Sequence, residues 1–136
     1  MVNVPEGSTI KVNNIFGGAY GTDTYHPCDV YEANVNYRSA TSIVEGAIYG
    51  GNNNKRRTLY GKVNISAPVY TGKSDPTTGA LYLGTVYGAG FGGDSWSEYT
   101  EVNLESGAKV YEVYGGGQAG KVHNAESVQK FLRIHK

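Results

Sequence analysis

The chain has a single cysteine and no excess of charge of either sign. Because a disulfide needs two thiols, Cys28 alone excludes an intramolecular disulfide framework. Twelve basic and twelve acidic residues cancel, so no basic field attracts nucleic acid or an anionic membrane surface. No apolar run approaches the roughly 20 residues that a membrane-spanning helix requires. We therefore expect no nucleic acid partner and no membrane insertion.

Helix-forming residues are also scarce, whereas glycine and tyrosine are abundant. The 136 residues include 20 glycines and 12 tyrosines, a composition that favours strands joined by tight turns. A hydrophobic content of 39% suffices for one modest core, so we expect a single domain over residues 1–136.

Two short patterns recur along the chain. Valine, asparagine and an apolar residue follow one another at Val35, Val63 and Val102, an alternation that is typical of a strand with one buried face. The asparagines should then face solvent or stack in a ladder. The second pattern is an apolar residue, an aromatic residue and a glycine-rich turn, and we attribute its glycines to corners with positive φ. Its four copies are Ile15–Gly18, Ile48–Gly51, Val86–Ala89 and Val113–Gly116.

Repeats this small must stack on one another to bury their apolar faces. They predict an all-β fold, a short parallel β-solenoid (β-helix) of about three to four irregular coils. An antiparallel β-sandwich is the alternative fold. Residues 124–135 carry apolar side chains at spacings of three and four, which indicates a capping helix, with a frayed tail as the alternative. The repeat units cover about 9–37, 42–70, 81–104 and 108–122.

Two of the turns share an aromatic residue, an aspartate and a second aromatic residue. Arg56 and Lys121 occupy the place of the aspartates in the other two copies, so we favour charge pairing between stacked turns. Exposed rings beside carboxylates would also suit a sugar, although we favour aromatic packing over glycan binding. The candidate ligand-binding residues are Tyr20, Asp23, Tyr25, Phe91, Asp94 and Trp96.

Three further motifs resemble a calcium site, a phosphate-binding loop and a cysteine–histidine site. Residues 89–97 are similar to the calcium-binding nonapeptide of β-rolls, which keeps calcium as an alternative for this turn. Residues 115–121 match part of a P-loop, but Val122 stands where a serine or threonine must hold magnesium. Cys28 lies beside His26 without a second ligand pair, so we favour an inert loop. We expect no catalytic residue, no metal site and no cofactor apart from the calcium alternative.

The phrase Glu112–Gly117, together with the strands that carry valine and asparagine, resembles the glycine-rich β-solenoid repeat regions of bacterial surface or adhesin-like proteins. The resemblance covers about residues 9–122. It implies an extracellular or cell-surface location within a longer secreted protein, and a structural or ligand-presenting role. A glycan or a host or cell-surface protein is the implied partner, and an oligomer is compatible with it. A carbohydrate-active β-helix enzyme (lyase or hydrolase) and a phage-fibre-like oligomeric stalk are the alternative functions.

Overall fold

The computed structural model describes residues 1–18, 30–118, 121–122 and 132–134, and these residues are all-β with no helix among them. None of them lies in a helix long and apolar enough to cross a bilayer. The strands are β1 (Val2–Val4), β2 (Lys11–Val12), β3 (Ile15–Phe16), β4 (Val30–Tyr37), β5 (Ile43–Val44), β6 (Ala47–Tyr49), β7 (Asn53–Ile65), β8 (Tyr70–Ser74), β9 (Leu81–Leu83), β10 (Thr85–Tyr87), β11 (Phe91–Leu104), β12 (Glu112–Tyr114), β13 (Lys121–Val122) and β14 (Leu132–Ile134).

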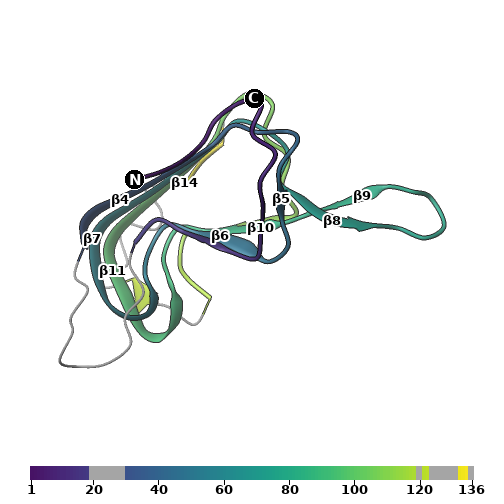
Figure 1. The fold of residues 1–136 in the computed structure, drawn as a ribbon. Helices are drawn as coiled ribbons and strands as arrows, with labels where there is room; N and C mark the ends of the chain where they lie inside the picture. Colours follow the sequence, from purple (N-terminus) through teal and green to yellow (C-terminus); the bar gives the residue numbers. More distant parts are fainter. Residues whose placement is uncertain (19–29, 119–120, 123–131, 135–136) are drawn as a thin grey trace.

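The strands form three sheets that receive successive strands of the chain in turn. The first sheet has the order β1-β4-β7-β11-β13, with β14 also paired to β11; the second is β2-β5-β8-β9, and the third is β12-β10-β6-β3. In Figure 1, β4, β7 and β11 curve side by side along one side of the molecule, while β6 and β10 lie along another. All described strand pairs are parallel except β8 with β9, so the antiparallel β-sandwich alternative is wrong.

The recurring valine and asparagine pattern sets the register of the first sheet. Val35 pairs with Val63, and Val63 pairs with Val102, so the three valines lie in one row. All three are fully buried. Because side chains alternate across a strand, the asparagine after each valine points to the outer face. The strand prediction from this pattern is therefore confirmed.

The core is one cluster to which all three sheets contribute. Val44 comes from the second sheet and Ile48 and Val86 from the third, and all three are fully buried. Burial of this apolar surface is the main favourable term in folding. The other buried members are Val4, Ile15, Val35, Tyr37, Val63, Ile65, Val69 and Val102.

The glycines of the repeated phrase serve close stacking rather than unusual backbone angles. Gly50 and Gly88 donate backbone hydrogen bonds of 2.8 Å to the carbonyls of Tyr87 and Tyr114 in the neighbouring strands. A Cβ added to Gly88 would lie 2.6 Å from the Gly115 carbonyl oxygen. None of the described glycines in the phrase has a positive φ, so our attribution of them to positive φ is wrong.

The C-terminal prediction is wrong for the residues that the structure describes. Leu132–Ile134 forms β14 and pairs in parallel with Val102–Leu104, whereas the spacing of apolar residues predicts a helix. A short isolated helix is only marginally stable, whereas the open edge of β11 offers backbone hydrogen bonds to a neighbouring strand, and this pairing overrides the local pattern. The rest of the predicted cap, residues 124–131 and 135, lies outside the described residues.

A hairpin departs from the parallel pattern. β8 and β9 pair antiparallel and project from the rest of the molecule (Figure 1). Asp75 stabilises the turn between them, because its carboxylate accepts hydrogen bonds from the backbone N–H groups of Thr77 and Thr78 at 2.7 and 2.9 Å. These bonds lower the pKa of Asp75, the Thr78 amide having the larger effect.

Candidate functional site

On the first sheet, the regular alternation of inward and outward side chains is interrupted where the strands bend. Inward and outward side chains alternate along most of β7, but Leu59 and Tyr60 both lie outside between the buried Thr58 and Gly61. The same interruption occurs at residues 31–32 of β4 and 98–99 of β11. The interruptions lie in register, with Glu32 opposite Tyr60 and Tyr60 opposite Tyr99, and β4, β7 and β11 curve together in Figure 1. The bend brings three tyrosines to one place on the surface.

These three tyrosines line an apolar groove of about 330 Å³, which we call the tyrosine groove. The rings of Tyr60 and Tyr99 are stacked, with centroids 5.3 Å apart and planes at 17°. Tyr31 stands edge-on to Tyr60, at 5.7 Å and 75°. With 70% of its surface exposed, Tyr31 keeps open ring area for a ligand. The other lining residues are Glu32, Gly61, Lys62, Thr100 and Glu101.

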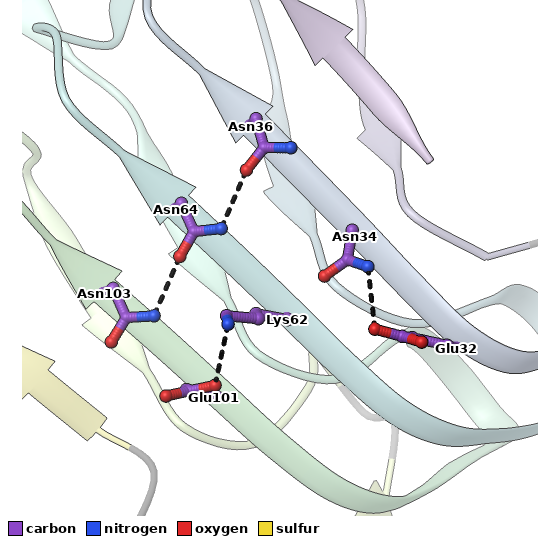
Figure 2. Close-up of polar contacts among 7 residues, drawn as sticks. All are labelled: Glu32, Asn34, Asn36, Lys62, Asn64, Glu101 and Asn103. Atoms are coloured by element: carbon purple, nitrogen blue, oxygen red, sulfur yellow. Dashed lines mark hydrogen bonds and ion pairs between the residues drawn. The ribbon is translucent and has the colours of Figure 1, made fainter.

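Beside the tyrosines, a row of side-chain amides crosses four strands. Asn36 donates to Asn3 at 2.9 Å, Asn64 donates to Asn36 at 2.7 Å, and Asn103 donates to Asn64 at 2.8 Å. Figure 2 shows three members of this amide ladder, Asn36, Asn64 and Asn103, pointing along the row toward one another. The ladder confirms one of the two arrangements expected for the repeated asparagines.

The amide ladder forms the floor of a second, polar groove of about 340 Å³, which we call the amide groove. Asn103 is only 7% exposed, and its Oδ1 has no hydrogen-bond partner in the structure. Lys62 and Glu101 line both grooves and form an ion pair of 3.6 Å between them (Figure 2). The remaining lining residues are Arg38, Ser66 and Glu105, with Asn36 and Asn64.

A second aromatic row runs along the third sheet and is structural. Phe16, Tyr49, Tyr87 and Tyr114 stack with successive centroid distances of 4.6, 5.0 and 5.1 Å. Tyr49 is 3% exposed and donates its hydroxyl to Gln118 at 2.5 Å. Burial, and secondarily the neighbouring Tyr87, raises the pKa of Tyr49 to about 12. The repeated aromatics therefore stack and hold neighbouring strands together, as the sequence predicts.

Three of the candidate ligand-binding residues, Phe91, Asp94 and Trp96, follow the third copy of the repeated phrase and lie on strand β11. Phe91 opens β11 and stands edge-on to Tyr49 at 6.0 Å, while Trp96 is exposed on the same strand. The register changes between Phe91 and Asp94, where Gly92 has a φ of +94°. This shift places Asp94 opposite Lys55 and Ser95 opposite Arg56. The basic residue opposite Asp94 is therefore Lys55, and Arg56, which occupies the equivalent place in the repeat, lies one residue further along.

Of the predicted site residues whose side chains the structure describes, none lies in either groove. Neither Phe91 nor Trp96 lines the tyrosine groove or the amide groove. Tyr20, Asp23 and Tyr25 lie outside the described residues, as does Cys28. In the part of the chain that the structure describes, no group of three or more histidine, cysteine, aspartate or glutamate residues could hold a metal ion.

Sequence reasoning missed the tyrosine groove, although a signal was present. Tyr60 and Tyr99 each lie three residues before the valine of the repeated pattern, at Val63 and Val102. Tyr31 lies four residues before Val35. Stacked repeats place equivalent positions in one row, so a tyrosine at a nearly constant distance from the valine predicts a row of tyrosines.

Comparison with known proteins does not indicate a function for the two grooves. No family model matches the chain, and no curated protein or solved structure matches it. The function must therefore be inferred from the chemistry of the two grooves.

Proposed function

We propose that this chain is a β-solenoid module of an adhesin-like protein from a bacterial surface, and that it binds a glycan in the tyrosine groove. The single observation that carries this proposal is the row of Tyr31, Tyr60 and Tyr99 beside a face rich in hydrogen-bonding groups. The module is a structural support that presents this face to the outside of the cell.

The support for a β-solenoid is the order in which the strands enter the sheets. β1, β2 and β3 each pair in parallel with the strand three places later, β4, β5 and β6, and the cycle continues to β7, β8 and β10. Each turn of such a chain would bury its apolar residues against the next turn. Stacking of this kind gives a stiff surface on which equivalent side chains line up.

The chemistry of the tyrosine groove suits a sugar. The C–H face of a sugar ring packs on an aromatic ring, and its hydroxyls need donors and acceptors at the edge of that ring. Tyr31 offers the open aromatic surface, since Tyr60 and Tyr99 are stacked on each other. Glu32 and Lys62 lie in the lining and supply an acceptor and a donor. Glu32 already accepts a bond of 3.1 Å from Asn34, which holds its carboxylate in place.

A glycan-array screen with two matched variants tests the proposal. Tyr31→Ala removes the open ring of the groove, whereas Tyr111→Ala removes an equally exposed ring (71%) that lines neither groove. We expect the Tyr111 variant to bind as the unchanged protein does and the Tyr31 variant to lose most binding. Absence of any glycan binding, or equal binding by the two variants, would refute the proposal.

The same screen is run with calcium and with a chelator, to test whether glycan binding depends on calcium. Binding through the tyrosine groove should persist in chelator, because the groove acts through aromatic packing and hydrogen bonds. Binding that requires calcium would point instead to the segments that contain Asp23 and Asp94.

A further inference from the structure

We infer that the amide groove is a second subsite for an uncharged glycan, so that one sugar chain extends from the tyrosine groove onto the amide ladder. This inference rests on the proposed glycan binding and specifies its ligand.

The first step is that the two grooves are adjacent. Lys62 and Glu101 line both of them. Along β7, Tyr60 in the first groove and Asn64 in the second are four residues apart, which is about 13 Å at roughly 3.3 Å per residue. A ligand that spans them must therefore be a chain of several sugar units that lies along the strands.

The second step is an unsatisfied acceptor. From Asn36 onward, the Nδ2 of each asparagine in the amide ladder donates to the Oδ1 of the preceding asparagine. No asparagine follows Asn103 in the row, and its Oδ1 has no hydrogen-bond partner. A buried acceptor without a donor is unfavourable and rare. Amides linked in a row polarise one another, which strengthens the terminal acceptor. This oxygen is shielded from solvent in the free protein, so a sugar hydroxyl that enters the amide groove must displace the groups that cover it in order to supply the missing donor.

The third step is the charge of the groove. Lys62 and Glu101 neutralise each other across 3.6 Å, and the other two charged residues of the lining, Arg38 and Glu105, have opposite signs. A sulfated or carboxylated sugar would gain no net attraction from this lining, and neither would a cationic ligand. Amides and a serine hydroxyl both donate and accept hydrogen bonds, as the hydroxyls of an uncharged sugar do. An uncharged polyhydroxyl chain is therefore the ligand that fits.

Two variants of the amide ladder separate binding from stability. Asn103→Ala and Asn3→Ala each delete one amide-to-amide hydrogen bond, but only Asn103 lines the amide groove. Each variant is screened on an array that holds uncharged, sialylated and sulfated glycans of two to six units. Affinities for uncharged di- and tetrasaccharides that bind are then measured by calorimetry, and thermal unfolding is recorded in parallel.

We expect uncharged glycans of four or more units to bind best. Asn103→Ala should weaken the tetrasaccharide about tenfold, the loss expected for one buried hydrogen bond, and leave the disaccharide unchanged. Asn3→Ala should leave both affinities unchanged. Tyr31→Ala should weaken both ligands, which distinguishes the first groove from the second.

Several outcomes would overturn the inference. If Asn103→Ala binds the tetrasaccharide as tightly as Asn3→Ala does, the amide groove is no subsite, while the proposed function stands through the effect of Tyr31. A preference for sialylated or sulfated glycans contradicts the uncharged ligand. If no glycan binds, the inference and the proposed function both fall.

A different hypothesis is that the unpaired oxygen of Asn103 contributes to the stability of the fold and not to ligand binding. It is tested at Arg133, which lies opposite Asn103 in the register of β14 and β11. If Arg133→Ala destabilises the chain as much as Asn103→Ala does and leaves tetrasaccharide affinity unchanged in both variants, the acceptor serves the fold. The inference would then be wrong.

Discussion

Replacing Gly88 with alanine should destabilise the fold strongly, because this glycine, just after β10, packs closely against the backbone just after β12. A Cβ at Gly88 would lie 2.6 Å from the Gly115 carbonyl oxygen, 3.1 Å from Cβ of Thr100 and 3.2 Å from Cγ2 of Val102. The first distance is shorter than any ordinary carbon to oxygen contact, and the oxygen belongs to backbone, which cannot rotate away. The strands must therefore separate.

The size of the effect follows from the contacts that separation would disturb. Gly88 donates a 2.8 Å hydrogen bond to Tyr114, and Thr100 donates one of 2.7 Å to the same Gly115 oxygen that the new methyl would meet. Overpacking a filled site costs about 1–3 kcal/mol, and weakening one hydrogen bond adds about 1 kcal/mol. Alanine regains a few tenths to about 1 kcal/mol through the unfolded chain. We expect a net loss of roughly 2–3 kcal/mol in the free energy of unfolding.

The assay is urea unfolding followed by far-ultraviolet circular dichroism, with Gly84→Ala as the control. A Cβ at Gly84 would meet only the Val69 side chain at 3.2 Å, and no carbonyl lies closer than 3.7 Å. Gly84→Ala should change the unfolding free energy by less than about 1 kcal/mol. If both variants unfold at the same urea concentration, close strand stacking is not what requires glycine in the repeated phrase.

Two further predictions concern the core and the buried tyrosine. Ile48→Ala should cost about 2–5 kcal/mol of unfolding free energy, because Ile48 is fully buried in the cluster to which all three sheets contribute, and an unchanged urea midpoint would contradict that placement. Burial raises the pKa of Tyr49 to about 12, above its value in the unfolded chain, so stability that is complete below about pH 10 should decline as the pH rises toward 12. Ultraviolet titration of Tyr49→Phe against the unchanged protein checks this, since the variant should lack one late-ionising tyrosine.

The sequence by itself determined which segments become strands in the repeated parts. Valine and asparagine alternate at Val35, Val63 and Val102, and alternation with period two selects an extended chain wherever one face is buried. The repeated aromatic phrase likewise predicted the stack of Phe16, Tyr49, Tyr87 and Tyr114. Both patterns are local and recur, so they could be recognised without knowing which strands are neighbours.

Only the tertiary structure decided which side chains meet across strands. The shift in register after Phe91 put Arg56 opposite Ser95, and the free edge of β11 made a strand of Leu132–Ile134, whose spacing predicts a helix. The bend in β4, β7 and β11 gathered Tyr31, Tyr60 and Tyr99 into the tyrosine groove. Register shifts and bending depend on hydrogen bonds between residues far apart in the chain, so the position of each tyrosine relative to the repeated valine predicts a row of tyrosines but not the groove.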